Sequence, residues 1–448
     1  MESSLNKPNT YTKINFSAIL IVFAWPLIRF ILYFFTRAIT ITFNTIFLFI
    51  ILTYFLIILI LWLVNEKNKK QCLKNIKNDI LGKPELIILA CFLLWMTISC
   101  FFSIEPVRSL FGISCNNELV EEGLTQFYFY GCMFIFAYTL RDENKTILLL
   151  KVLMYFSLII SILVFIDPDS KFFPAFLKSY PYSAMFVNPN HYGYYLTLVS
   201  LIATGLSLSE KNIYKKILYS AITIVLFIQL FLTYSTGPQL AVFIILLLLP
   251  FAKIFFKSDY SWQNFVPLSV FLILALFINK GNFYSDLYTA GKQFLMLIGI
   301  LNPSGMGSDG IELDINTFGT DRIGLWKSAI SVALSNPIFG TGLGCMMHNG
   351  AYDRPHNEYL QYAANIGIIG ALIYIAALVT MFVRACKNRK QTCDLSFLLG
   401  CSVYGYLISA FFGNTMPHVM PFFAVILGFY IYSIKPFEKN KFEKNKVA

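Results

Sequence analysis

The segment Arg354-Pro355-His356-Asn357 combines residue types that can move a proton and hold an anion. If His356 lies near the N-terminus of a helix, the positive end of the helix dipole disfavours the charged imidazolium. A neutral imidazole can take a proton from an attacking hydroxyl. Arg354 and the same helix start can bind an anionic group such as a diphosphate, with Asn357 beside them. A single histidine is usually structural, but these neighbours favour a catalytic His356.

The residues around His356 predict the helix that would position it. Pro355 suits the first turn of a helix, and Asp353 can cap that helix. The helix would continue into the apolar range 366–383, where Gly367 and Gly370 allow close packing against another helix. We therefore expect His356 near the N-terminus of a long helix.

A second cation lies upstream, in a range that predicts an amphipathic helix. Residues 320–334 can be capped by Thr320 or Asp321, and Ser335-Asn336-Pro337 ends the pattern. The spacing predicts one apolar face, formed by Ile323, Trp326, Ile330 and Leu334. Arg322 would lie in the first turn, where a cation opposes the helix dipole. Either an anionic ligand holds Arg322 there or Asp321 offsets its charge.

Glycines follow this helix in Phe339-Gly340-Thr341-Gly342-Leu343-Gly344. The segment follows a helix and is not part of a βαβ unit, which argues against a nucleotide-binding loop. We expect these glycines to let the backbone turn tightly beside a substrate or a membrane surface.

Other polar residues are weaker candidates. Asn190 and His191 begin an apolar run and are candidates to line an acceptor groove, although His191 could equally cap that helix. His418 lies in a short connection and could simply face water. The acidic stretch with Glu121 and Glu122 is most simply solvated.

The composition points to a lipid environment. Only 13% of the residues are charged and 57% are hydrophobic, whereas a soluble chain carries about 25% charged residues. Lys and Arg occur in short segments between apolar runs and not on a basic face with interleaved aromatics, which argues against a nucleic acid partner. The nine Cys residues include no CxxC pair, which favours small packed side chains over a metal site or a disulfide framework.

A membrane-spanning helix needs about 20 mostly apolar residues. The apolar runs predict an all-α polytopic membrane protein with about twelve transmembrane helices. The expected spans are 15–35, 41–64, 86–103, 125–140, 147–166, 190–208, 217–234, 238–256, 264–279, 366–383, 395–412 and 420–434.

Alternate connections between these spans hold most of the Lys and Arg residues, which places both termini in the cytoplasm. We expect transmembrane helices 1–9 in residues 1–279, a periplasmic loop with short helices in 280–365, helices 10–12 in 366–434 and a cytoplasmic tail in 435–448. The long loop carries Arg322, Arg354 and His356, and long loops with unusual chemistry are where function is expected.

The chain resembles the O-antigen ligase and polymerase family of the bacterial inner membrane. The resemblance rests on "RIGLW…NPIFGTGLG", Arg322 to Gly344, followed by "RPHNEYLQYAANIGIIG", Arg354 to Gly370. It implies a glycosyltransferase that moves a glycan from an undecaprenyl-diphosphate donor to an acceptor hydroxyl of lipid A-core or another acceptor, in contact with membrane lipid. It also implies that no metal and no cofactor are needed.

The resemblance assigns roles to individual residues. His356 matches the family's catalytic histidine, the base that activates the acceptor hydroxyl, and Arg322 matches an arginine that grips the donor diphosphate. Family ligases often carry Ser-Arg at the outer end of the seventh or eighth helix, but residues 233–241 contain no Arg. Arg354 could replace that cation, and so could Arg29, an arginine within the first apolar run that could also only snorkel to the interface.

Three functions therefore compete. A ligase and a polymerase of the same family share the chemistry, and the missing Arg in 233–241 weakens the ligase relative to the polymerase. A polysaccharide flippase or transporter would place charged residues along a central path, whereas this chain concentrates its polar chemistry in one external loop.

Overall fold

The computed structural model describes residues 10–36, 79–115, 118–168, 181–184, 188–255, 262–278, 282–288, 322–349, 354–389 and 394–434, together with residues 53, 56, 57, 60 and 186. These residues are mainly helical, as the sequence predicts. The longer helices are α1 (Thr10–Thr36), α4 (Pro84–Phe101), α6 (Leu124–Leu140), α7 (Glu143–Ile166), α8 (Pro189–Ser209), α9 (Ile213–Leu232), α10 (Thr236–Phe255), α11 (Val266–Phe277), α13 (Arg322–Ser335), α14 (Glu358–Lys387), α15 (Asp394–Ala410) and α16 (Met420–Ser433).

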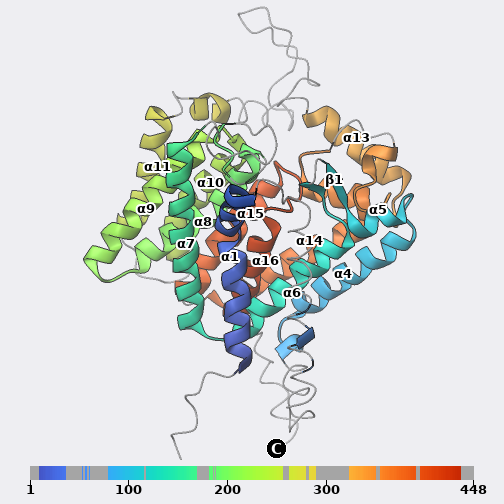
Figure 1. Cartoon of the computed structure of the whole chain (residues 1–448), viewed down its shortest axis with the longest axis horizontal. Helices are drawn as coiled ribbons and strands as arrows, with labels where there is room; N and C mark the ends of the chain where they lie inside the picture. Colours follow the sequence, from blue (N-terminus) through green and yellow to red (C-terminus); the bar gives the residue numbers. More distant parts are fainter. Residues whose placement is uncertain are drawn as a thin grey trace, which may run out of the picture.

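Shorter elements gather at one end of the bundle. They are α5 (Pro106–Phe111), the 3-10 turn η3 (Met346–Asn349), and an antiparallel hairpin of β1 (Ile113–Cys115) and β2 (Glu118–Glu121). Figure 1 shows α5, β1 and α13 together at this end, which we call the site end. A second 3-10 turn, η1 (Trp262–Phe265), lies at the opposite end, where Gln263 accepts a hydrogen bond from Lys216. The hairpin is an addition to the all-α prediction.

Each expected span except 41–64 overlaps a helix, and 41–64 lies almost wholly outside the described residues. Among the described helices, α4, α7, α9 and α14 are long and apolar enough to cross a membrane, and a bent pair around α11 would add a fifth. Shorter apolar stretches lie in α1, α10, α15 and α16. The chain therefore has several membrane-capable helices, and the full number of about twelve stays a prediction.

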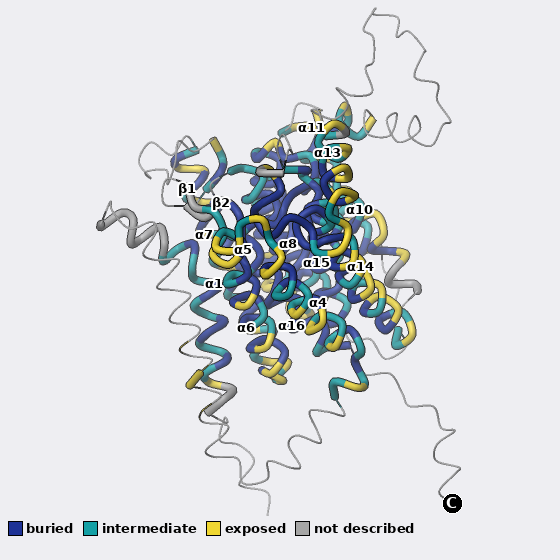
Figure 2. The backbone as a smooth tube through the Cα atoms, turned by 90° about the vertical axis from the view of Figure 1, so that its right-hand side faces the viewer, coloured by how far each residue is buried: buried dark blue, intermediate teal, exposed yellow. Residues whose placement is uncertain are grey.

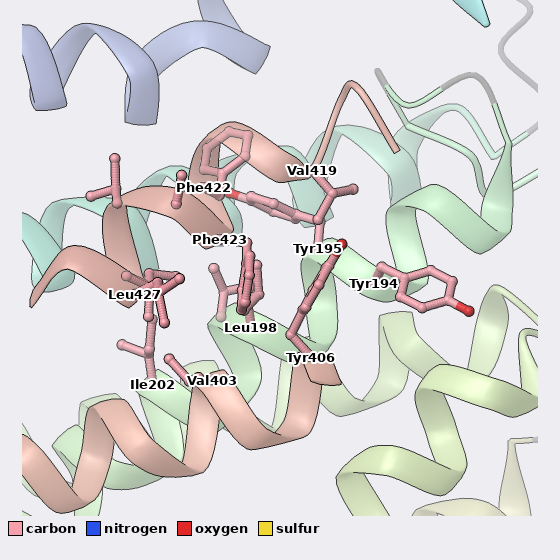
Figure 3. Close-up of a cluster of buried hydrophobic side chains, with 14 of the residues drawn as sticks. Tyr194, Tyr195, Leu198, Ile202, Val403, Tyr406, Val419, Phe422, Phe423 and Leu427 are labelled. Atoms are coloured by element: carbon pink, nitrogen blue, oxygen red, sulfur yellow. The ribbon is translucent and has the colours of Figure 1, made fainter. Parts of the chain in front are cut away.

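The centre of the bundle is formed by α8, α15 and α16, whose turns are buried while the outer helices expose one face (Figure 2). Two glycines allow α8 and α15 to approach closely, because a Cβ on Gly405 would lie 2.3 Å from Leu201 and one on Gly205 would lie 2.6 Å from Leu398. Figure 3 shows side chains of all three helices meeting there, including Leu198, Ile202, Val403, Tyr406, Phe422 and Phe423. The rings of Tyr406 and Phe423 stack at 4.1 Å. This core holds the helices that carry the candidate site.

Helix α14 bends at Ile366 and Gly367, where the backbone leaves helical geometry. Gly367 has a φ of +80°, and a Cβ there would lie 2.0 Å from the carbonyl oxygen of Ile338, so only glycine fits. Trp95 donates from Nε1 to the Ile366 carbonyl at 2.9 Å, which satisfies a group freed by the bend. The bend falls at the boundary expected between 280–365 and 366–434, although that division itself stays a prediction.

The glycine-rich segment 339–344 lies against this bend. Gly340, Gly342 and Gly344 all have positive φ, so the predicted tight turns are present. The amide of Gly342 donates to the Asn365 carbonyl at 2.8 Å, and a Cβ on Gly342 would lie 1.9 Å from Ser103 Oγ. In the described structure these glycines therefore lie against protein, between α4 and the bend of α14, and not beside an open surface.

Helix α13 is present and ends at Ser335, as predicted, but its buried face differs from the expected one. The residues buried against α14 are Ala329 and Val332, which pack with Leu360 and Ala364. Ile330 and Leu334 are 44% and 65% exposed, and the side chain of Ile323 lies outside the described part. The reason is that small side chains let α13 and α14 approach closely, which turns the bulkier residues outward.

Candidate active site

His356 lies just before α14 and not within its first turn. The N-cap of α14 is Asn357, whose side chain accepts a hydrogen bond from the Leu360 amide at 3.1 Å. The expectation that Pro355 begins the helix is therefore wrong, and Asp353 lies outside the described residues. His356 has a φ of +46°, a left-handed conformation that is costly for a residue with a Cβ.

The connection between α15 and α16, residues 411–419, contacts each part of the site. Asn414 Nδ2 lies 3.4 Å from His356 Nδ1, and the Thr415 amide donates to Gln361 Oε1 at 3.0 Å. The His418 ring lies 5.9 Å from the His191 ring. The expectation that His418 only faces water is therefore wrong, since it packs against a second histidine.

Arg354 lies between two acidic residues and a histidine. Its Nε is 3.6 Å from Glu121 Oε1, and its charge also acts on Glu122 and on His191. His356 acts on His191 as well. Arg354, His356 and His191, which come from two distant parts of the sequence, are therefore neighbours.

The acidic stretch that the sequence suggested to be solvated is buried where its side chains are described. Glu121 is 6% exposed and Glu122 is 3% exposed, because the hairpin carries them under residues 341–345 and 354. Burial raises the pKa of the Glu122 carboxyl to about 8, against smaller lowering effects that include the Thr415 hydroxyl and Arg354. Tyr130 donates to Glu122 Oε1 at 3.4 Å. Glu122 is thus a carboxyl group that is mainly neutral at pH 7.

A further buried carboxylate lies directly after the N-cap. Glu358 is fully buried and accepts hydrogen bonds from Tyr374 at 3.0 Å and from Tyr406 at 3.2 Å. Its two oxygens are therefore held by core tyrosines. This anchors the start of α14 to the centre of the bundle.

Arg322 reaches the same region from α13. Its side chain is half-buried, and both Arg322 and Glu358 act electrostatically on the hydroxyl of Tyr194. In Figure 3 that hydroxyl points away from the apolar core. A Cβ on Gly413, next to Asn414, would lie 2.0 Å from the same hydroxyl oxygen. Arg322 and the His356 segment thus lie around one tyrosine.

Several buried polar atoms at this place have no hydrogen-bond partner among the described residues. They are Glu122 Oε2, His191 Nδ1, Trp326 Nε1 and Asn414 Oδ1. Buried polar groups are normally satisfied, and each unpartnered group needs an explanation. Their concentration around His356 fits a site that receives a polar ligand.

A large apolar cavity opens next to these groups. Its volume is about 1050 Å³, and its walls come from α10, α14 and α15. Trp326 and Asn357 line it at the site end, whereas Asn388 and Ile434 line it at the other end. The cavity therefore runs along α14, from the end near Arg322 and His356 to the end at Asn388 and Ile434.

The remaining predicted site residues have clear positions. The Asn190 side chain accepts a hydrogen bond from Ser235 at 2.6 Å. Asn188 caps α8, so His191 is not the helix cap. Arg29 lies in α1, but its side chain lies outside the described part. Asn357 lines the cavity while its oxygen caps α14.

The turn between α9 and α10, within residues 233–241, reaches the site through Ser235 and Asn190. It brings no cation, whereas Arg354 and Arg322 lie at the same end of the described structure. No group of three or more His, Cys, Asp or Glu placed to hold a metal ion occurs in the described part of the chain.

Sequence reasoning missed the contribution of Glu122 and Asn414. Glu122 follows a polar stretch, and Asn414 lies in a short connection, so neither has a local pattern that indicates burial. Their role depends on contacts with residues far away in the sequence.

A comparison with protein families matches residues 221–375 to the family model described as O-antigen ligase. The matched range begins in α9, includes Arg322, the glycine-rich segment and His356, and ends after the bend of α14. The comparison with curated proteins gives no match.

Proposed function

We propose, because residues 221–375 match the family model described as O-antigen ligase, that this chain is a membrane glycosyltransferase of the ligase type. The family implies glycan and lipid-linked substrates. The donor would be a glycan on undecaprenyl diphosphate, and the acceptor a hydroxyl of lipid A-core or of another glycan. The reaction would take place at the periplasmic face of a bacterial inner membrane.

The observation that carries this proposal is the meeting of an apolar cavity with a polar cluster. A lipid-linked donor has a long apolar tail, a charged diphosphate and a polar glycan, in that order. The cavity of about 1050 Å³ is lined mainly by apolar side chains and ends at Trp326 and Asn357. Arg322, Arg354 and His356 lie around this end. A polyprenyl tail in the cavity would therefore place the diphosphate beside the guanidinium groups.

The reaction would then need one base and one anion site. The imidazole of His356 takes the proton of the acceptor hydroxyl as the acceptor oxygen attacks the anomeric carbon. The bond between that carbon and the diphosphate oxygen breaks, and the diphosphate leaves with the electron pair. Arg354 and Arg322 balance the charge on the leaving group, so the proposed route needs no metal. Asn190, His191 and Asn357 would contact the sugars.

The distribution of charge supports the orientation. Many Lys and Arg side chains lie in or next to the connections at the end opposite the site: Lys83, Arg141, Lys145, Lys211, Lys215, Lys216, Lys387 and Arg389. Positive residues are retained on the cytoplasmic side. The site end would thus face the periplasm, with both termini in the cytoplasm.

A polymerase that joins one lipid-linked repeat to another is the second candidate. The observation in its favour is the turn in residues 233–241, which carries no Arg where family ligases often carry one. Deleting the gene separates the two functions. Loss of a ligase leaves bare lipid A-core while lipid-linked polymer accumulates, whereas loss of a polymerase leaves core capped with a single repeat. Normal surface glycan in the deletion strain would contradict both.

A further inference from the structure

Asn414 occupies a position beside His356 that the proposed reaction has not yet used. Its side chain is buried, at 5% exposure, and its Nδ2 lies 3.4 Å from His356 Nδ1. Its Oδ1 is buried without a hydrogen-bond partner among the described residues. An amide with one end against a histidine and the other end unsatisfied is unusual in a protein interior.

The backbone around Asn414 holds it in place from both sides. The Thr415 amide donates to Gln361 Oε1 on α14 at 3.0 Å. Gly413 packs so closely on the Tyr194 hydroxyl that a Cβ would lie 2.0 Å from the oxygen. Asn414 is therefore fixed relative to α8 and α14, which also carry His191 and the N-cap Asn357.

The direction of the amide decides which nitrogen of His356 can act as a base. If Nδ2 faces Nδ1, the ring accepts at Nδ1, and a neutral imidazole carries its hydrogen on Nε2. That ring cannot take a proton at Nε2. If the amide turns by 180°, Oδ1 accepts from Nδ1–H, the unsatisfied oxygen gains a partner, and Nε2 keeps a free lone pair. The rotated amide thus pairs the buried oxygen with Nδ1–H, moves the Nδ2 donors to the former position of the oxygen, and leaves Nε2 as a base.

We propose that Asn414 is a positioning residue for His356, whose side-chain oxygen accepts a hydrogen bond from Nδ1–H and leaves Nε2 as the proton acceptor. The catalytic use of Nε2 rests on the proposed glycosyl transfer, whereas the tautomer does not. The Cys-His-Asn proteases also combine an asparagine with a histidine base.

Other charged and titratable groups also act on this histidine or its neighbours, and the test has to separate them from Asn414. They are Arg354 on the same segment, His191 on α8, Glu121 and Glu122 on and after the hairpin, Glu358 on α14, Arg322 on α13 and His418 in the 411–419 connection. A substitution at Asn414 leaves all of these in place.

The direct test is nitrogen NMR of the full-length protein in nanodiscs with ¹⁵N-labelled histidine. The chain has only four histidines, so a His356→Ala spectrum assigns the His356 ring by difference. We expect His356 to carry its proton on Nδ1 and to move toward the Nε2–H form in Asn414→Ala. The Asn388→Ala variant, at the far end of the cavity, should leave the His356 signals unchanged. A wild-type ring protonated on Nε2, or a tautomer that Asn414→Ala does not change, would overturn the proposal.

The pH dependence of transfer provides a second measurement. Asn414→Asp keeps the size of the side chain but places a carboxylate at Nδ1, which favours the imidazolium. The acid limb of the transfer rate should move to higher pH by about one unit, whereas Asn414→Ala should slow transfer by about ten- to a hundredfold. A purely structural asparagine would change the rate without moving the limb, and that result would overturn the proposal. If Asn414→Ala does not fold, the isosteric Asn414→Asp carries the pH measurement, and the tautomer of the wild-type ring alone tests the proposal by NMR.

The two hypotheses fail in different ways. If glycosyl transfer continues in His356→Ala, the proposed catalytic function is excluded, but the result on the His356 tautomer still holds. If the wild type is active, His356→Ala is inactive and the acid limb of the Asn414→Asp pH profile does not move, only the positioning role of Asn414 is excluded.

Discussion

Arg354 Nε lies 3.6 Å from Glu121 Oε1, and Glu121 is almost fully buried, so a cation from the segment next to His356 neutralises a carboxylate of the hairpin. Arg354 also acts on the neighbouring Glu122. Removing one partner of a buried pair leaves the other charge uncompensated, which costs about 3–5 kcal/mol. The pair therefore links the stability of the hairpin to the anion site.

The Arg354→Ala variant should consequently lose both stability and donor affinity. We expect a lower Tm and a donor Kd raised at least about tenfold, because one phosphate contact and the charge balance of Glu121 disappear together. Arg354→Ala combined with Glu121→Gln should recover Tm but not donor affinity. The control is Arg108→Ala, since Arg108 pairs with an exposed Glu105 at the same end of the molecule and should change neither quantity. Unchanged donor binding in Arg354→Ala would exclude Arg354 from the anion site.

The cavity along α14 predicts a dependence on lipid length. Cys401 lines the cavity, so Cys401→Trp should obstruct it and raise the KM for a donor with a full polyprenyl tail. A donor with a short tail should be affected much less. Cys91→Trp is the matched control, because Cys91 is exposed on α4. Equal effects of Cys401→Trp on long and short donors would argue that the tail lies elsewhere.

Two glycines with opposite environments test the tight turn beside α14. Gly342 has a φ of +104°, and a Cβ there would lie 1.9 Å from Ser103 Oγ. We expect Gly342→Ala to lower the free energy of unfolding by about 2 kcal/mol or more and to reduce transfer, since the turn supports the bend of α14 at Ile366 and Gly367. Gly324→Ala in α13 meets nothing within 4 Å and should be neutral or stabilising by up to about 1 kcal/mol. Thermal unfolding in detergent measures both.

The raised pKa of Glu122 predicts that the free energy of unfolding falls as pH rises. Burial raises its pKa to about 8, whereas the unfolded carboxyl titrates near its model value of 4.5. The folded state then holds a proton that the unfolded state has lost, so stability declines between these two values and levels off above pH 8. Glu122→Gln removes the titration, so its Tm should fall less than that of the wild type between pH 5 and 8. Identical pH profiles for the two proteins would show that Glu122 titrates normally.

The helices were predictable because each consists of a long apolar run, and lipid solvent imposes helices on such runs. The bend of α14 was not predicted, because Gly367 was assigned only to close helix packing, and its positive φ depends on the contact with the distant Ile338. The exact start of α14 was not predictable. Both Asp353 and Asn357 are good N-caps, and the choice depends on Glu358 being held by Tyr374 and Tyr406, which lie far along the chain.

The chemistry of the site was predicted in part. His356, Arg354 and Arg322 were identified by residue type and motif, and the structure brings them around one end of the cavity. Glu122 and Asn414 were missed because burial, not residue type, gives them their properties. The buried face of α13 differs from the predicted apolar face for the same reason. The periodicity of a sequence identifies an apolar face, but it cannot tell whether that face packs against another helix or lines a cavity.

The central claim is that His356 takes the acceptor proton in a glycosyl transfer from a lipid diphosphate. It is tested most directly with purified protein in liposomes, an undecaprenyl-diphosphate glycan and lipid A-core, following product by gel mobility. The wild type and the control His348→Ala, which changes a histidine of η3 (Met346–Asn349), should form product. His356→Ala should be slower by about a hundredfold or more while keeping its Tm and donor Kd. Transfer by His356→Ala at the wild-type rate would contradict the account.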